Sequence, residues 1–123
     1  MYKTSVGNIN TELLGKALQS LACNIGAEIG NKVKDYYGND LAVAFSLKSK
    51  GLPNGIGFSV QNNTLMVHGD AYGSRNEWDR TKTLVENYVK AYKVAQQARI
   101  SHPQAQINTR IHDREVILEV VTP

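Results

Sequence analysis

The chain has 123 residues, of which 41% are hydrophobic and 20% charged, so it is long enough for one hydrophobic core and too short for two ordinary domains. No apolar run approaches the roughly 18 residues of a membrane-spanning helix, and the N-terminal residues lack the apolar stretch of a secretory signal. The single cysteine, Cys23, excludes an internal disulfide and is typical of a reducing compartment. We therefore expect one cytoplasmic domain over residues 1–123, with no membrane partner.

The first part of the chain predicts a strand and a helix. Residues 2–6 alternate between apolar and polar side chains, which is typical of a strand. The segment from Asn8 to Thr11 then introduces a helix with one apolar face, and Gly26 is expected to end it. That face consists of Leu13, Leu14, Ala17, Leu18, Leu21 and Ala22. Because Gly15 lowers helix propensity by about 1 kcal/mol relative to alanine, we expect a packing reason for it.

Four strands are predicted next, over residues 31–37, 41–48, 56–60 and 64–68, because apolar residues alternate in each of them. The sequence Gly38-Asn39-Asp40 is typical of a turn. Asn62-Asn63 predicts a two-residue hairpin turn, since asparagine tolerates a positive φ. The segment from Ser49 to Gly55 is expected to be a mobile, polar hairpin tip.

A long amphipathic helix is the best-specified element of the chain. Asn76 is its expected N-cap, and Pro103 stops the helical pattern. Its apolar stripe consists of Trp78, Thr81, Leu84, Val85, Tyr88, Tyr92 and Ala95. Two further strands, over residues 105–111 and 116–120, are expected to form a closing hairpin.

These elements have the order β-α-β-β-β-β-α-β-β, and their short connections favour antiparallel pairing. The sequence therefore predicts an α+β fold, a largely antiparallel sheet with two helices packed on one face. The residues expected to be buried together in the core are Leu18, Phe45, Phe58, Leu84, Val116 and Leu118. Unpaired strand edges in so small a domain favour binding to another copy, so we expect a homo-oligomer.

No group of residues has the spacing that catalysis or metal binding requires. His68, His102 and His112 share no metal-ligand spacing with one another or with Cys23. No glycine-rich loop has the form that binds phosphate, and no serine lies in a nucleophile-elbow sequence. The sequence therefore predicts a protein without enzymatic activity, metal or cofactor.

The densest polar cluster is the connector before the long helix, with Asp70, Tyr72 and Arg75 as candidate ligand-binding residues. In one interpretation it binds a small anion or nucleotide: Arg75 and the N–H groups at the helix start hold the anion, and Tyr72 stacks on it. In the other interpretation Asp70 caps a turn, Tyr72 packs on the helix and Arg75 pairs with a carboxylate. The sequence leaves both interpretations open.

The net charge of +3 and the pI near 9.0 are only mildly basic. Lys82, Lys90 and Lys93 of the long helix, with Arg99 beyond them, would be able to follow a phosphate backbone. No aromatic pair, however, has the spacing on an exposed strand that base stacking needs. A solvated helix face accounts for these lysines, and nucleic acid is not an expected partner.

Several short motifs resemble those of a known family. They are Tyr36-Tyr37-Gly38, Gly55-Ile56-Gly57-Phe58, Asp70-Ala71-Tyr72 before Trp78, and Leu84, Tyr88 and Tyr92 on the long helix. Together they resemble the small family called chloroplast hypothetical reading frame thirty-five, which plastids and cyanobacteria encode and which has relatives in other bacteria and in phages. The chain departs from that family in a shorter middle loop and in its closing turn, His112-Asp113-Arg114, where the family tends to have Asp-Gly or Asn-Gly.

The resemblance implies no catalytic residues, since none are established in that family. It implies a role as an accessory to other proteins, with AAA-type ATPases as candidate partners. The expected function is therefore a non-enzymatic protein-interaction module that acts as a homo-oligomer. The alternative is a protein that binds or sequesters a nucleotide or another small anion, of the sort that phages encode against signalling nucleotides.

Overall fold

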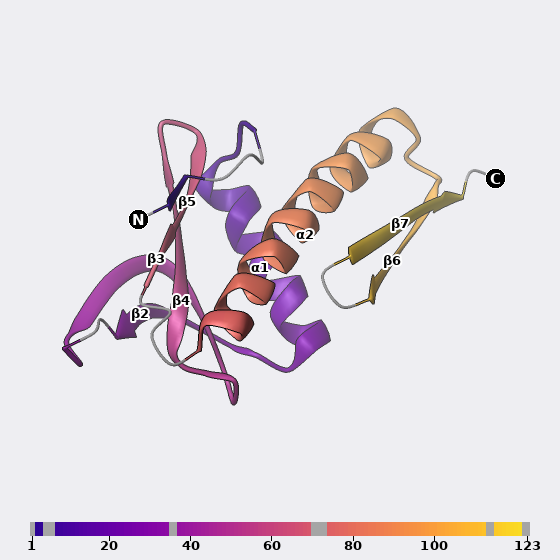
Figure 1. Ribbon diagram of the computed structural model, residues 1–123. Coiled ribbons are helices and arrows are strands. Elements are labelled where there is room, and N and C mark those ends of the chain that lie inside the picture. The colour runs from indigo at the N-terminus through magenta and orange to yellow at the C-terminus, as the bar shows by residue number, and fades with distance from the viewer. Residues whose placement is uncertain (1, 4–6, 35–36, 70–73, 113–114, 122–123) are drawn as a thin grey trace.

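The computed structural model describes the whole chain except residues 1, 4–6, 35–36, 70–73, 113–114 and 122–123. The elements follow one another in the predicted order (Figure 1). They are β1 (Tyr2–Lys3), α1 (Thr11–Ile25), β2 (Glu28–Lys34), β3 (Asp40–Ser49), β4 (Leu52–Gln61), β5 (Thr64–His68), α2 (Arg75–Ser101), β6 (Gln106–His112) and β7 (Glu115–Val121). This order confirms the predicted α+β class.

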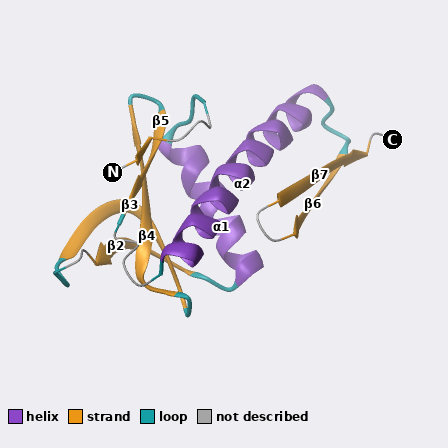
Figure 2. Ribbon diagram, viewed as in Figure 1, coloured by secondary structure: helices purple, strands orange, loops and turns teal. Residues whose placement is uncertain are grey.

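The main sheet has five strands in the spatial order β1-β5-β4-β3-β2, and each neighbouring pair is antiparallel. Strands β2 to β5 are neighbours both in sequence and in space, whereas β1 joins at the far edge beside β5. Figure 2 shows both helices on the same side of this sheet. The apolar faces of the helices and of the sheet enclose the core between them.

The C-terminal hairpin forms a second, two-stranded sheet of β6 and β7 and does not extend the main sheet. It lies on the side of α2 that faces away from the main sheet (Figure 1). Helix α2 therefore has the main sheet on one side and β7 on another. The face opposite the apolar stripe, which the sequence assigned to solvent, is partly covered.

Helix α1 begins and ends as the sequence predicted. The side chain of Asn10 caps its start by accepting a hydrogen bond from the N–H of Leu13, at 2.7 Å. Gly26 ends it in the left-handed conformation, with φ of 70°, and donates its N–H to the carbonyl of Ala22. A Cβ added at Gly15 would lie 2.9 Å from Cζ of Phe45, so the missing side chain lets the phenyl ring pack on the helix. This is the packing reason expected for Gly15.

Two strand predictions need correction. The strand predicted over 31–37 lies at Glu28–Lys34, because the chain enters it directly after the Gly26 cap and Ala27. The segment 49–55 is not a long hairpin tip: Ser49 already pairs with Leu52, so β3 and β4 meet at a tight turn. Leu52 is almost fully buried, and burial of this side chain fixes the start of β4. The predicted turn at Asn62-Asn63 is confirmed, with φ of 51° and 61°.

The core contains part of the set that the sequence predicted. Leu18, Phe58 and Leu84 are buried, and Phe45 packs on the cluster while half-buried. Val116 also packs on the cluster while half-buried, whereas Leu118 is half-buried in the separate hairpin and is not part of the cluster. The hydroxyl of Tyr88, on α2, lies 2.5 Å from Oγ of Ser20, on α1, and joins the two helices.

Candidate functional site

Of the three connector residues that the sequence singled out, Asp70 and Tyr72 lie outside the described residues. Arg75 is the first residue of α2 and not the residue before the N-cap, since Ser74 holds the cap position that was expected for Asn76. The guanidinium of Arg75 lies 3.5 Å from the carboxylate of Asp79, and both side chains are more than half exposed. In the second interpretation of the connector, Arg75 was expected to pair with a carboxylate, and this is where its side chain lies.

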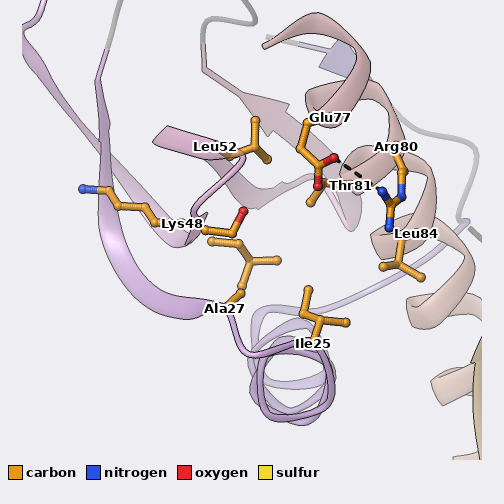
Figure 3. Close-up of a pocket in the computed structure, with 10 residues that line it drawn as sticks. Ile25, Ala27, Lys48, Leu52, Glu77, Arg80, Thr81 and Leu84 are labelled. Atoms are coloured by element: carbon orange, nitrogen blue, oxygen red, sulfur yellow. Dashed lines mark ion pairs between the residues drawn. The ribbon is translucent and has the colours of Figure 1, made fainter. Parts of the chain in front are cut away.

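A cavity of about 140 Å³ lies between the end of α1, the turn from β3 to β4 and the first turns of α2 (Figure 3). Its apolar lining consists of Ile25, Ala27, Leu47, Leu52 and Leu84. Arg80 and Glu77 form an ion pair of 3.5 Å at its rim, and the ammonium group of Lys48 points away from it (Figure 3). A cavity of this size and lining is large enough for an apolar body about as big as a benzene ring.

A serine and a histidine share a hydrogen bond on the main sheet. Oγ of Ser59, on β4, lies 2.6 Å from Nε2 of His68, on β5. Partial burial lowers the pKa of the His68 imidazole below its ordinary value of 6.5. The fold therefore favours the neutral form of His68.

The lowered pKa of His68 predicts a loss of stability in weak acid. The unfolded chain binds the proton more tightly than the folded one, so the contribution of neutral His68 is complete above about pH 6.5 and is lost as the pH falls through the lower folded pKa. We expect the melting temperature to fall more between about pH 7 and pH 5 in the wild type than in His68→Gln. His102→Gln, at an exposed histidine, is the control and should keep the wild-type slope; equal slopes for all three proteins would contradict the prediction.

The basic residues of α2 do not form one continuous charged face. Nζ of Lys82 lies 2.7 Å from a carboxylate oxygen of Glu86, and both side chains are largely covered. Lys82 is therefore held by an ion pair within the helix, and Glu86 interrupts the row of basic residues.

Among the described residues, no group of three or more histidine, cysteine or carboxylate side chains is arranged to hold a metal ion. Cys23 is a free, exposed thiol on α1. Within the same part of the chain, neither helix combines the length and the apolar character needed to cross a lipid bilayer.

Exposed apolar side chains concentrate at the C-terminal end of the molecule. We call this region the C-terminal arm and define it as residues 90–101 of α2 together with β6 and β7. Of the nine large apolar side chains that are exposed among the described residues, five lie in the arm. They are Val94, Ile100, Ile117, Val120 and Val121. Only Ala95 is buried among the last twelve residues of α2, so this end of the helix projects beyond the core.

A groove of about 560 Å³ separates α2 from β7 within the arm. One wall is a single stripe of α2, with residues at spacings of three and four: Asn87, Lys90, Ala91 and Val94. The other wall is a run of consecutive residues of β7: Glu115, Val116, Ile117 and Leu118. The walls are apolar at Val94 and Ile117 and carry one charge of each sign, on Lys90 and Glu115.

Comparisons with known proteins add no relative. No family model matches the chain, and no similar curated protein or solved structure was found. The resemblance to the plastid reading-frame family thus remains a prediction from the motifs.

The arm was not predicted from the sequence, because the last hairpin was expected to belong to one sheet. The sequence of β7 nevertheless contains one signal that the hairpin has apolar surface on both faces. The sequence of β7, Glu-Val-Ile-Leu-Glu-Val-Val, places apolar residues on both faces of the strand. A strand with one face in a core and the other in water should alternate, so this composition is typical of a strand that is covered on both faces.

Proposed function

We propose that this chain is a non-enzymatic protein-interaction module that acts as a homo-oligomer in the cytoplasm and associates through its C-terminal arm. The observation that carries the proposal is the concentration of five exposed apolar side chains in the arm, of which Val94 and Ile117 line its groove. Contiguous exposed apolar surface in a folded protein commonly marks an interaction site.

The architecture of the arm supports this role. An isolated two-stranded hairpin is marginally stable in water, because it cannot bury enough apolar surface. Strand β7 of the hairpin lies against α2, while Ile117, Val120 and Val121 stay exposed. Covering these side chains with a partner would remove apolar surface from water and stabilise the hairpin at the same time.

A charge placed in the groove tests the proposal. We expect the wild-type protein to scatter light as a multiple of 13.6 kDa at micromolar concentration, and Val94→Glu to weaken self-association at least about tenfold. The side chain of Val94 is 56% exposed, so the change should leave the fold of each copy intact while it puts a charged carboxylate into an apolar interface.

Leu41→Glu is the matched control, since Leu41 is also exposed, at 45%, but lies on β3 in the main sheet. Its self-association should equal that of the wild type, and circular dichroism should show that both variants are folded. A wild-type mass of 13.6 kDa at every concentration, or dissociation by Leu41→Glu alone, would contradict the proposal.

The second candidate function, binding of a small ligand, has one observation in its favour. The cavity of about 140 Å³ has an apolar interior with the Glu77–Arg80 pair at its rim, which would suit a small molecule with an apolar body and a polar head.

The AAA-type ATPase partner rests on the family resemblance alone and would be a second partner of the assembled module.

A further inference from the structure

The free edge of β7 lines the groove of the arm. Successive side chains of a strand point to opposite faces, so a surface lined by four consecutive residues is the edge of the strand and not one of its faces. The other edge of β7 pairs with β6 along its whole length, from Gln106↔Val121 to His112↔Glu115. One row of backbone groups of β7 is therefore left for a partner strand.

We propose that β7 of a second copy fills the groove and pairs antiparallel with β7 across a two-fold axis that passes beside Leu118. This inference rests on the proposed function and names the partner of the same surface. The two hairpins would then form one continuous four-stranded sheet in the order β6-β7-β7-β6. A two-fold axis closes this contact, so assembly through it stops at the dimer.

The register follows from the geometry of antiparallel pairing. Residues that lie directly opposite share a face of the sheet, and faces alternate along each strand. A two-fold axis perpendicular to the sheet must therefore pass beside one residue, which faces its own copy. Among the described residues of β7, the candidates near the middle of the strand are Ile117, Leu118 and Glu119.

Two criteria favour an axis beside Leu118: the positions of the glutamates, and the number of residues that find a partner. An axis beside Ile117 would place Glu115 opposite Glu119 of the second copy, and an axis beside Glu119 would place two copies of Glu119 opposite each other. Like charges directly opposite destabilise a sheet. With the axis beside Leu118, Glu119 faces Ile117 and Glu115 faces Val121, and all seven residues from Glu115 to Val121 find a partner residue.

The same pairing sets the side of the sheet on which the two copies of α2 lie. Val116 and Leu118 are the half-buried residues of β7 and mark the face that contacts α2. A two-fold axis perpendicular to the sheet keeps this face on the same side in both copies, so each α2 packs on its own β7 on one side of the four-stranded sheet. The groove and the open edge are then covered by one partner.

Disulfide trapping tests the register. In a Cys23→Ser background, which removes the exposed native thiol, Leu118→Cys should form a cross-linked dimer in most chains under mild oxidation. Directly opposite Cα atoms lie about 4.5–5.5 Å apart, within the range of about 4.4–6.8 Å that a disulfide spans. Ile117→Cys is the matched control and should stay uncross-linked, because its own copy would lie diagonally, at about 7–8 Å.

A mixture of Val116→Cys and Val120→Cys chains gives an independent readout, since these two residues face each other only in this register. Cross-linking of the mixture but of neither variant alone supports the proposal, even if Leu118→Cys does not fold. Cross-linking of Ile117→Cys alone would overturn it and move the axis by one residue. If no variant cross-links while the wild type still associates, the β7 pairing is wrong and the proposed function stands; a monomeric wild type would refute both.

Discussion

Replacing Phe58 with alanine should lower the free energy of unfolding by about 3–5 kcal/mol, which is the usual cost of removing a fully buried phenyl ring. Phe58 is 0% exposed and lies on β4, near the middle of the main sheet, where it pairs with Phe45 on one side and Val67 on the other. The substitution removes apolar surface from the core and leaves a cavity that three strands and the helices border. These neighbours are held by the sheet, so they are unable to collapse into the space.

Urea unfolding followed by circular dichroism measures this effect as a shift of the midpoint at constant slope. Leu41→Ala is the control, because Leu41 lies on the neighbouring strand but is 45% exposed, and it should cost less than about 1 kcal/mol. A loss below about 1 kcal/mol for Phe58→Ala would mean that the core is not arranged around β4.

Leu84→Ala and Leu18→Ala should both destabilise the protein, within the range of about 2–5 kcal/mol for buried leucines, but by different amounts. Leu18 is 0% exposed on α1, whereas Leu84 is 6% exposed on α2 and borders the cavity of about 140 Å³. Truncation of Leu84 enlarges a space that already reaches the surface, so water is able to enter it. We therefore expect Leu84→Ala near the lower end of the range and Leu18→Ala near the upper end.

The comparison is made by urea unfolding of both variants under identical conditions. The opposite ranking would show that the cavity at Leu84 is closed to solvent. A change of less than about 1 kcal/mol for Leu84→Ala would remove this residue from the core.

Local chemistry let the sequence predict α1, the turn at Asn62-Asn63 and the order of elements. Each of these depends on residues close together in the chain: Asn10 and Gly26 cap a helix without help from distant parts. The start of β4 depends instead on burial of Leu52, which packs in the core. Such boundaries are set by tertiary contacts, which periodicity does not contain.

The placement of the last hairpin shows the same limit. Alternating residues in β6 and β7 predicted two strands and their pairing, and both are present. The pattern does not state which surface the hairpin covers. Val116 reaches the border of the core cluster, whereas Leu118, on the same face of β7, lies outside it.

The candidate site was predicted least well. Polar residues in a connector before a helix drew attention to Arg75, which lies exposed beside Asp79. The arm carries its exposed apolar groups on two elements, α2 and β7, that only the fold brings together. A search for chemically reactive groups overlooks such a surface, because shape and apolar area define it.

The strand order of the main sheet determines which contacts have to form across the longest stretch of chain. Strands β2 to β5 follow one another through turns, so each pairing closes a short loop at low entropic cost. Strand β1 must instead find β5, with Tyr2 beside Val67, and this contact encloses α1 and the whole meander. We expect the meander to assemble early and the N-terminal strand to dock last, as the step that closes the edge beside β5.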